Sequence, residues 1–384
     1  MDMLKYYNEF NIVPVHQGAP TDNFGNFKFQ RERLYQNLGV SMNMLQGKDI
    51  LEFGPGTGDN ALVLLQYNPN LLHLVDGNRA SMDSIEEKFQ NSRNQIFKNV
   101  NCYFSDARDF LISSQKPFIG YDLVICEGMI NGNDDPTNLL RHISGFVKPG
   151  GNLVITTVSS LGVLDQALRR IFKPAICLKT NIYQDQVKMA CDIFKTHLNH
   201  LPTTKPIEDW VQDAILHPLD KEYTFDTGDA VTALNKEFVA LGSSPSFFQD
   251  FIWHKALSRD TDYRNGMFIE QFKSMSPMLI DSSVHTHIEV ANVGILENLA
   301  AQAWGISCDI WISDSYKQWE ALAQILKEIV DLLQNCLPDV ATAISEFSSN
   351  FENVMLGNFE TPMPYFEKWW GRGLTYVSFT KNNC

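Results

Sequence analysis

The feature of this sequence that most constrains its fold is a short apolar run that leads into three glycines at alternate positions. Residues 50–53 read Ile-Leu-Glu-Phe, and Gly54, Gly56 and Gly58 follow in the segment Gly-Pro-Gly-Thr-Gly. Glycine is needed where the backbone turns sharply or where a ligand approaches it closely. Doubly wound α/β sheets bind ligands in the crevice at the carboxyl end of the first strand, so the segment predicts a ligand-binding turn between a strand and a helix.

The segment from residue 49 to residue 158 alternates short apolar runs with helical patterns. We expect strands at residues 50–53, 71–75, 100–104, 121–126 and 153–158. Helices are expected between them at residues 59–67, 81–89 and 136–147. Continuous apolar strands separated by helices are typical of a parallel sheet that is covered on both faces. The predicted fold class is therefore α/β with a doubly wound sheet.

A carboxylate stands at the end of the second predicted strand. Asp76 is followed by Gly77 and Asn78 and lies about 20 residues after the glycine segment, the spacing at which an acidic residue meets the hydroxyls of a ribose. A carboxylate can accept hydrogen bonds from two hydroxyls at once. The alternative is that Asp76 caps the next helix, a common role for aspartate.

The segment from Leu51 to Gly58 resembles the first motif of class I S-adenosylmethionine-dependent methyltransferases, in which an acidic residue and one further residue precede GxGxG. The resemblance covers residues 47–158, with the motifs in the family order. It implies a Rossmann-like sheet of the seven-stranded methyltransferase type and S-adenosylmethionine as cofactor. Two alternatives stay open. One is an NAD(P)-dependent oxidoreductase, whose fingerprint GxGxxG would place the third glycine one residue later. The other is a non-catalytic S-adenosylmethionine-binding scaffold.

The resemblance also assigns roles to individual residues. It implies that the glycine segment faces the methionine and ribose parts of the cofactor and that Glu52 helps to hold the loop and the cofactor's amino group. Asp106, after the third predicted strand, would contact the adenine amino group, and the backbone N–H of Ala107 would contact the ring. The fourth predicted strand would end beside the transferring methyl. The predicted cofactor-binding set is Glu52, Gly54, Pro55, Gly56, Thr57, Gly58, Asp76, Gly77, Asn78, Asp106, Ala107, Glu127 and Gly128.

Methyl transfer needs little acid–base chemistry, because the protein mainly has to align the reactants and exclude water. A general base is needed only when the nucleophile is a hydroxyl or an ammonium group. Glu127 is the first catalytic candidate because it follows the fourth predicted strand, and a cap of the following loop is the alternative. His16, in an aromatic N-terminal segment, is the second. No metal site is predicted, because Thr156 and Thr157 stand where metal-dependent O-methyltransferases have an Asp-Asn pair.

Composition narrows the partners. The chain carries 31 basic and 45 acidic residues, a net charge of −14, and has no Lys/Arg-rich run. A nucleic-acid substrate is therefore disfavoured, because such binders concentrate positive charge, and a small-molecule methyl acceptor is expected. No run of about 18 apolar residues occurs, so no membrane span is predicted. The seven cysteines have irregular spacings and no secretory signal is visible, which favours a cytoplasmic protein.

We expect three regions along the chain. Residues 1–47 would form an N-terminal cap segment, and residues 48–257 with 371–384 would form the methyltransferase core. Residues 258–370, with helical patterns such as the apolar stripe at 311–333, would form a helical insertion that covers the substrate or mediates homo-oligomerisation. The run at 246–254 has strand character and the run at 374–379 alternates like a strand, so the two would form a terminal pair that flanks this insertion.

Overall fold

The computed structural model describes residues 3–13, 24–91, 99–111, 120–201, 205–219, 221–249, 255, 261–313 and 315–383. The chain separates into two compact units. The sheet unit comprises Met1–Thr157, Phe225–Phe272 and Leu374–Cys384, and the helical unit comprises Val158–Thr224 and Lys273–Gly373. None of the described helices is long and apolar enough to cross a membrane.

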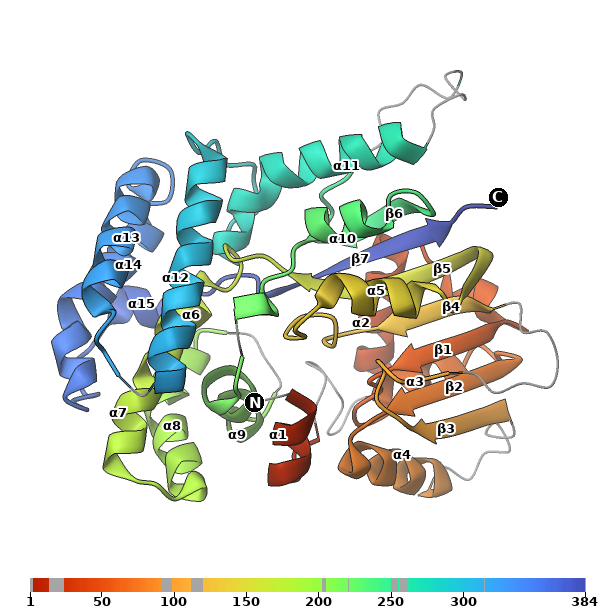
Figure 1. Cartoon of the computed structure of the whole chain (residues 1–384), viewed down its shortest axis with the longest axis horizontal. Helices are drawn as coiled ribbons and strands as arrows, with labels where there is room; N and C mark the ends of the chain where they lie inside the picture. The colour runs from red at the N-terminus through yellow and green to blue at the C-terminus, as the bar shows by residue number, and fades with distance from the viewer. Residues whose placement is uncertain are drawn as a thin grey trace. The chain divides into compact units, whose positions relative to one another are not determined.

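The sheet unit contains a seven-stranded sheet in the order β3-β2-β1-β4-β5-β7-β6 (Figure 1). The first five strands pair in parallel, whereas β6 and β7 pair antiparallel. This mixed sheet with helices between its strands confirms the predicted Rossmann-like fold of the methyltransferase type. The strands are β1 (Asp49–Phe53), β2 (Leu71–Asp76), β3 (Val100–Phe104), β4 (Tyr121–Cys126), β5 (Val147–Val158), β6 (Phe238–Ser244) and β7 (Leu374–Lys381).

The helices of the sheet unit begin where the sequence supplies suitable caps. Asp135 accepts a hydrogen bond from the Asn138 N–H at the start of α5, and Asp226 forms a capping box with Asp229 at the start of α10. The helices are α1 (Met3–Phe10), α2 (Phe24–Asn37), α3 (Asp59–Leu65), α4 (Arg79–Asn91), α5 (Pro136–Ser144), α10 (Thr227–Leu234) and α11 (Thr261–Met275), with the short 3-10 helix η1 (Met42–Leu45).

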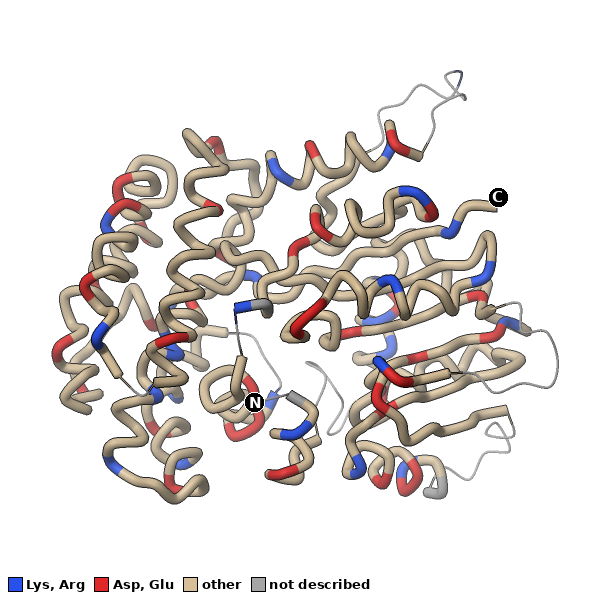
Figure 2. Tube along the Cα trace, viewed as in Figure 1, with Lys and Arg blue, Asp and Glu red and all other residues tan. Residues whose placement is uncertain are grey.

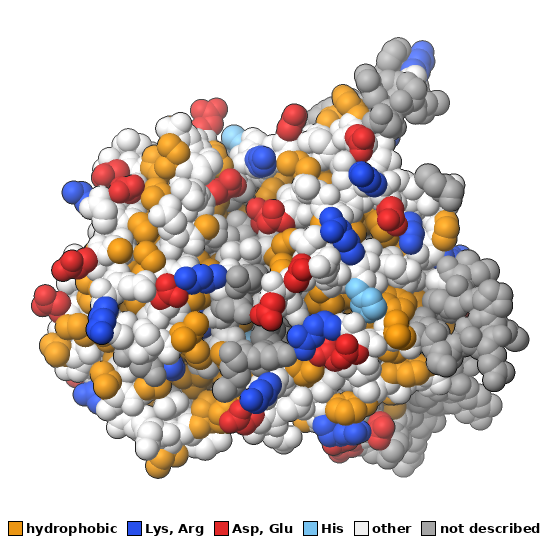
Figure 3. Space-filling model, viewed as in Figure 1, with side chains coloured by type: hydrophobic (Ala, Val, Ile, Leu, Met, Phe, Trp, Pro, Cys, Tyr) orange, Lys and Arg blue, Asp and Glu red, His pale blue; other side chains and the backbone are white. Residues whose placement is uncertain are grey.

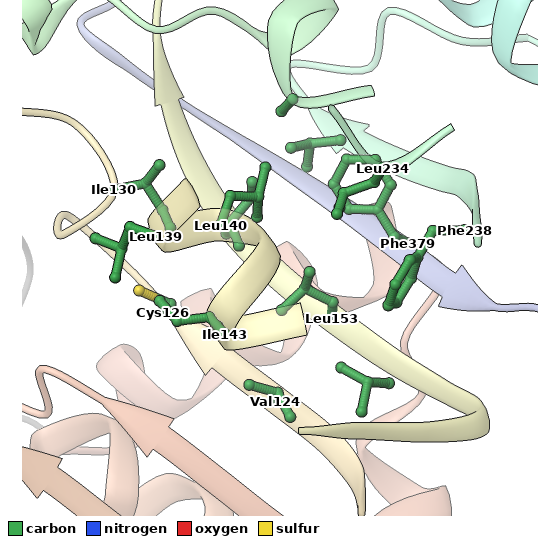
Figure 4. Close-up of a cluster of buried hydrophobic side chains, with 14 of the residues drawn as sticks. Val124, Cys126, Ile130, Leu139, Leu140, Ile143, Leu153, Leu234, Phe238 and Phe379 are labelled. Carbon is green, nitrogen blue, oxygen red and sulfur yellow. The ribbon is translucent and has the colours of Figure 1, made fainter. Parts of the chain in front are cut away.

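Two apolar layers cover the two faces of this sheet. Side chains alternate between the faces of a strand, so Leu51 and Phe53 join one layer while Ile50 joins the other. The first layer packs α5 and α10 against β4 to β7. Figure 4 shows part of this cluster of buried side chains, with those of α5 lying over the strands. The second layer contains side chains of α2 and α3. Glu52 alternates with Leu51 and Phe53 and therefore lies on the face covered by α2 and α3.

One predicted strand is wrong. The sequence predicts a strand at residues 246–254, but β6 ends at Ser244 and residues 246–249 form no strand, while 250–254 lie outside the described residues. Two of the aromatic residues that suggested a strand pack against α11 instead. The Phe247 ring lies 5.1 Å from that of Phe272, and the Phe248 ring lies 5.3 Å from that of Phe268. β7 pairs instead with β6, and the chain between these two strands contains long helices.

The helical unit begins directly after β5, so residues 158–224 belong to it rather than to the sheet unit with which the predicted boundaries grouped them. Its packing explains this. Arg169 of α6 is fully buried and donates from Nη2 to the carbonyl oxygens of Phe366 (2.9 Å) and Trp369 (2.7 Å), about 200 residues later in the chain.

The predicted stripe at 311–333 is divided between two helices, with a break between Ser313 and Trp319. The helices of the unit are α6 (Leu164–Arg170), α7 (Phe172–Lys179), α8 (Tyr183–Leu198), α9 (Ile207–Val211), α12 (Val293–Ser313), α13 (Trp319–Leu333), α14 (Pro338–Met355) and α15 (Pro364–Lys368). Its short turns are the π-helical turn η3 (Gln212–Leu216) and the 3-10 turns η4 (Lys221–Tyr223) and η5 (Ser276–Ile280).

Candidate cofactor and active site

The glycine segment forms the turn between β1 and α3. Gly54, Gly56 and Gly58 have φ values of +66°, +54° and +77°, a left-handed backbone that other residues rarely adopt. A Cβ atom on Gly54 would lie 2.2 Å from the Met129 Sδ, so the loop after β4 approaches this turn closely. The alternate glycines are therefore required by the backbone itself, and the predicted turn is confirmed.

Glu52 is the last residue but one of β1 and is 2% exposed. Its Oε1 accepts a hydrogen bond from the Asn60 Nδ2 at 2.8 Å, whereas its Oε2 has no hydrogen-bond partner within the described parts of the chain. Burial raises the pKa of this carboxyl to about 7, with Glu127 adding to the rise, while Asn60 and Arg31 oppose it. A buried carboxylate with an open acceptor is suited to bind a cationic group.

Asp76 ends β2 and is 7% exposed. Its Oδ1 accepts from the Asn78 N–H at 2.8 Å. Burial raises the pKa of Asp76 to about 6, although the backbone N–H groups of Asn78 and Gly56 lower it. The Gly56 contact links this carboxylate to the glycine turn, so Asp76 and that turn lie side by side at the carboxyl edge of the sheet.

The N-terminal helix packs against the turn after Asp76. The Asn78 Nδ2 donates to the Ile12 carbonyl oxygen at 2.7 Å, and the Arg79 N–H donates to the Asn8 Oδ1 at 3.3 Å. A Cβ atom on Gly77 would lie 2.6 Å from the Leu4 Cδ2. The described part of the predicted cap segment thus covers this end of the sheet. His16 lies outside the described residues.

Asp106 follows β3 and caps a turn over residues 107–109. Its Oδ1 accepts from the backbone N–H of Arg108 at 2.8 Å, and its two oxygens accept from the Arg108 Nε at 3.0 and 3.1 Å. The side-chain hydrogen bond from Arg108 holds the pKa of Asp106 below its ordinary value. Asp106 is therefore ionised, and Ala107 beside it is buried.

Glu127 follows β4 and forms a buried ion pair with Arg31 of α2. The Arg31 Nη2 also donates to the Tyr35 hydroxyl at 3.2 Å. The next residue, Gly128, donates its backbone N–H to the Thr156 Oγ1 at 2.6 Å and has open space where a Cβ atom would stand. Glu127, predicted from the sequence to be catalytic, is thus held as an anion by Arg31.

Asn60 connects this ion pair to Glu52. The Arg31 Nε donates to the Asn60 Oδ1 at 2.9 Å, and the Asn60 Nδ2 donates to Glu52. Arg31, Tyr35 and Asn60 were not predicted as site residues. Their signal in the sequence is local: Arg31 and Tyr35 stand four residues apart on one face of a helix, and Asn60 lies in the turn of helix that follows the glycines.

In the described part of the chain, no group of three or more His, Cys, Asp or Glu residues is arranged to hold a metal ion.

The fold and the site define the class of protein: a Rossmann-like domain with a left-handed glycine turn and carboxylates at the ends of its strands, an arrangement typical of domains that bind nucleoside-containing cofactors. Comparison with known protein families identifies the domain more closely. Residues 29–214 match the family model described as "Methyltransferase domain". Residues 29–214 thus form a methyltransferase domain, and this match supports the class I S-adenosylmethionine-dependent methyltransferase superfamily, whose cofactor is S-adenosylmethionine. The superfamily and the cofactor predicted from the sequence are thereby confirmed.

Individual relatives are distant. A malonyl-[acyl-carrier protein] O-methyltransferase of Paenibacillus sp. (strain JDR-2) is 27% identical over 109 residues, which is 28% of this chain and 38% of that protein. Among solved structures, the CcbJ methyltransferase of Streptomyces caelestis is 18% identical, with a TM-score of 0.31 over 42% of this chain and 61% of that one. A methyltransferase of Clostridium acetobutylicum ATCC 824 is 21% identical, with a TM-score of 0.29 over 38% and 55%. The chain thus spans well under half the length of its curated relative.

Proposed function

We propose that this protein is an S-adenosylmethionine-dependent methyltransferase that transfers a methyl group to an O, N or C atom of a small molecule. The observation that carries the proposal is the open acceptor of the buried Glu52, beside a left-handed glycine turn and Asp76, in a chain with a methyltransferase domain. A cationic amino group and a ribose with two hydroxyls fit these residues, because a carboxylate accepts from both kinds of donor.

The cofactor assignments follow from this fit. Glu52 would accept hydrogen bonds from the amino group of the cofactor, and the backbone of residues 54–58 would line its methionine and ribose parts. Asp76, with Gly77 and Asn78 after it, would accept from the ribose hydroxyls. Asp106 and Ala107 would contact the adenine, and Gly128, where a Cβ would meet open space, would border the same site.

When bound, S-adenosylmethionine supplies an electrophilic methyl group, and the protein has to orient the acceptor and exclude water. Glu127 is proposed as the group at the acceptor end. Because Arg31 keeps it ionised, it could orient a hydroxyl or an ammonium group and receive its proton. His16 stays a proposal from the sequence.

Charge supports a small-molecule acceptor. Figure 2 shows Lys and Arg interspersed with Asp and Glu in both units, and the face in Figure 3 mixes basic with acidic, hydrophobic and uncharged side chains. With a net charge of −14, such a surface gives phosphates little to bind. A cytoplasmic location and homo-oligomerisation through the helical unit also stay predictions.

Calorimetry and thermal shift test the proposal. We expect S-adenosylmethionine and S-adenosylhomocysteine to bind in the low-micromolar to sub-millimolar range, roughly −5 to −8 kcal/mol, and NAD(H) to give no shift. Methyl-labelled S-adenosylmethionine with a panel of small hydroxyl, amine and carbon acceptors then tests transfer. A protein that shows neither heat nor shift at millimolar cofactor is not a methyltransferase, and one that binds but labels no acceptor supports the scaffold alternative.

Asp76→Ala is expected to weaken the binding of S-adenosylhomocysteine without unfolding the protein. Losing an acceptor for two hydroxyls should cost on the order of 1–3 kcal/mol, or roughly 5- to 150-fold in Kd. Asp83→Ala is the matched control, because Asp83 is an exposed carboxylate on the neighbouring α4. Unchanged affinity in Asp76→Ala would show that Asp76 only caps the turn after β2.

Cofactor binding is expected to release a proton near neutral pH. The pKa of Glu52 is about 7 in the ligand-free protein, and an ammonium group beside it favours the ionised form. At pH 6.5 binding should therefore release up to roughly one proton per site, and at pH 8 almost none from Glu52. Calorimetry at pH 6.5 in phosphate and in imidazole measures this, because the two buffers differ in their heats of ionisation. Equal binding heats in both buffers would contradict it.

A further inference from the structure

Arg31 is the only basic residue, among those that the structure describes, with hydrogen bonds to both Glu127 and Asn60. It is 6% exposed and lies on α2, outside the region of the glycine turn and the strand ends. Its guanidinium carbon lies 5.1 Å from the centre of the Tyr35 ring and 6.0 Å from that of Tyr376 in β7. Because these contacts restrict the Arg31 guanidinium, its hydrogen bonds can hold Glu127 and Asn60 in defined positions.

The groups around Arg31 form one electrostatic unit. Glu127 follows β4, Tyr35 lies on α2, Tyr376 on β7 and Glu52 on β1. Asp76 of β2 acts on Glu52, and Glu127 acts on Cys126 of β4. Burial opposes the charge on Arg31, yet Glu127 and the two tyrosines hold its pKa well above the ordinary value. Burial also raises the pKa of Tyr376 to about 12, so Tyr376 stays neutral. Arg31 is therefore the permanent cation between two buried carboxyl groups.

We propose that Arg31 is a positioning residue of the cofactor site, which holds Glu127 through the ion pair and Glu52 through Asn60, so that Glu52 presents a fixed oxygen to the cofactor and Glu127 a fixed oxygen to the acceptor. The inference rests on the proposed function, since it gives Glu52 the role of binding the cofactor's amino group. It extends that function to a helix of the N-terminal segment, which thereby becomes part of the site.

The two partners of the ion pair act on Glu52 with opposite sign. Arg31 lowers the pKa of Glu52 and Glu127 raises it. If Glu52 must be ionised to bind the cofactor, the affinity rises with pH through a midpoint that reports this pKa. Removing the charge of Arg31 should move the midpoint up, and removing the charge of Glu127 should move it down. A purely structural role for Arg31 predicts weaker binding at every pH and no such opposition.

The experiment measures the Kd of S-adenosylhomocysteine from pH 5.5 to 8.5 in the full chain. We expect Arg31→Gln to shift the midpoint up and Glu127→Gln to shift it down, each by roughly 0.5–1 pH unit. Arg31→Lys keeps the charge but not the forked geometry, so it should keep the parent midpoint with a several-fold weaker affinity. Arg33→Gln, an exposed position on the same helix, should match the parent in both.

Thermal unfolding without ligand gives a second readout. Arg31→Gln leaves the buried Glu127 carboxylate without its cationic partner, whereas Arg31→Gln/Glu127→Gln removes both charges. The double variant should therefore have the higher Tm. If instead Arg31→Gln leaves the midpoint in place, shifts it in the same direction as Glu127→Gln, or is no less stable than the double variant, the inference fails while the proposed function stands. A parent protein that does not bind S-adenosylhomocysteine overturns both.

Discussion

A chain that ends at Gly373, and so lacks β7, is expected to lose the cooperative fold of the sheet unit. β7 lies between β5 and β6 in the sheet, and its pairing with β6 runs from Phe238↔Lys381 to Ser244↔Tyr376. Val377 and Phe379 of β7 are fully buried in the layer of Figure 4. Deleting the strand removes these side chains, leaves β6 without a neighbour and deprives β5 of one of its two, a loss comparable to the whole stability of a domain, about 5–15 kcal/mol.

Circular dichroism melts and cofactor binding measure this loss. A chain that ends at Asn382 retains all of β7 and is the matched control. A single substitution grades the effect: Phe379→Ala should cost about 3–5 kcal/mol through the cavity that it leaves, whereas Leu374→Ala, at an exposed position of the same strand, should cost little. If the chain that ends at Gly373 binds S-adenosylhomocysteine and melts as the control does, β7 is dispensable for the sheet unit.

Local patterns predicted the parts of this fold that local physics determines. Strands β1, β2 and β4 and the second half of β5 are apolar runs buried on both faces, and the glycine turn needs left-handed backbone at three alternate positions. Both features can be recognised from the types of consecutive residues. β6 (Phe238–Ser244) failed this test because it contains Gly242 and two serines and has a mixed burial pattern, so the aromatic run that follows it looked more like a strand.

The candidate site likewise contains residues that local sequence patterns predict and residues that depend on long-range contacts. Glu52, Asp76 and Asp106 stand at strand ends, where position along the chain implies position at the sheet edge. Arg31 reaches Glu127 across 96 residues, and no spacing rule connects a helix before β1 with the end of β4. The Arg169 contacts that assign residues 158–224 to the helical unit are equally distant in sequence. The role of a buried arginine follows from the residues that it contacts, and here these residues are distant in the sequence. Local patterns therefore could not predict it.

Glu52→Gln is expected to have the largest effect of any single substitution on cofactor binding. The change removes the negative charge opposite the cofactor's amino group but keeps the size of the side chain and an oxygen for the Asn60 Nδ2. Truncating one partner of a buried charge pair costs about 2 kcal/mol or more, so the Kd of S-adenosylhomocysteine should rise roughly 30-fold or more at pH 8. The proton released on binding at pH 6.5 should largely disappear as well.

The same substitution is expected to stabilise the ligand-free protein, with an effect that depends on pH. Glu52 ionises with a pKa of about 7 in the folded protein, against 4.5 for an unperturbed glutamate. Between these values the folded protein retains a proton that the unfolded chain has lost, so this group makes stability fall as pH rises from about 4.5 to 7, and no further above 7. Glu52→Gln removes that penalty, which is on the order of 1–3 kcal/mol at pH 8.

Urea unfolding of the ligand-free parent and variant at pH 5 and pH 8 measures the effect. Glu52→Gln should be more stable than the parent at pH 8, and the difference should shrink toward pH 5, where both forms of residue 52 are mostly neutral in the fold. Glu87→Gln, an exposed glutamate on α4, is the control and should track the parent at both pH values. Opposite signs for binding and stability would show that the fold holds a costly charge at the cofactor site, because function requires it there. A variant that loses stability at pH 8 would instead mean that the Glu52 carboxylate has a partner which stabilises its charge in the ligand-free protein.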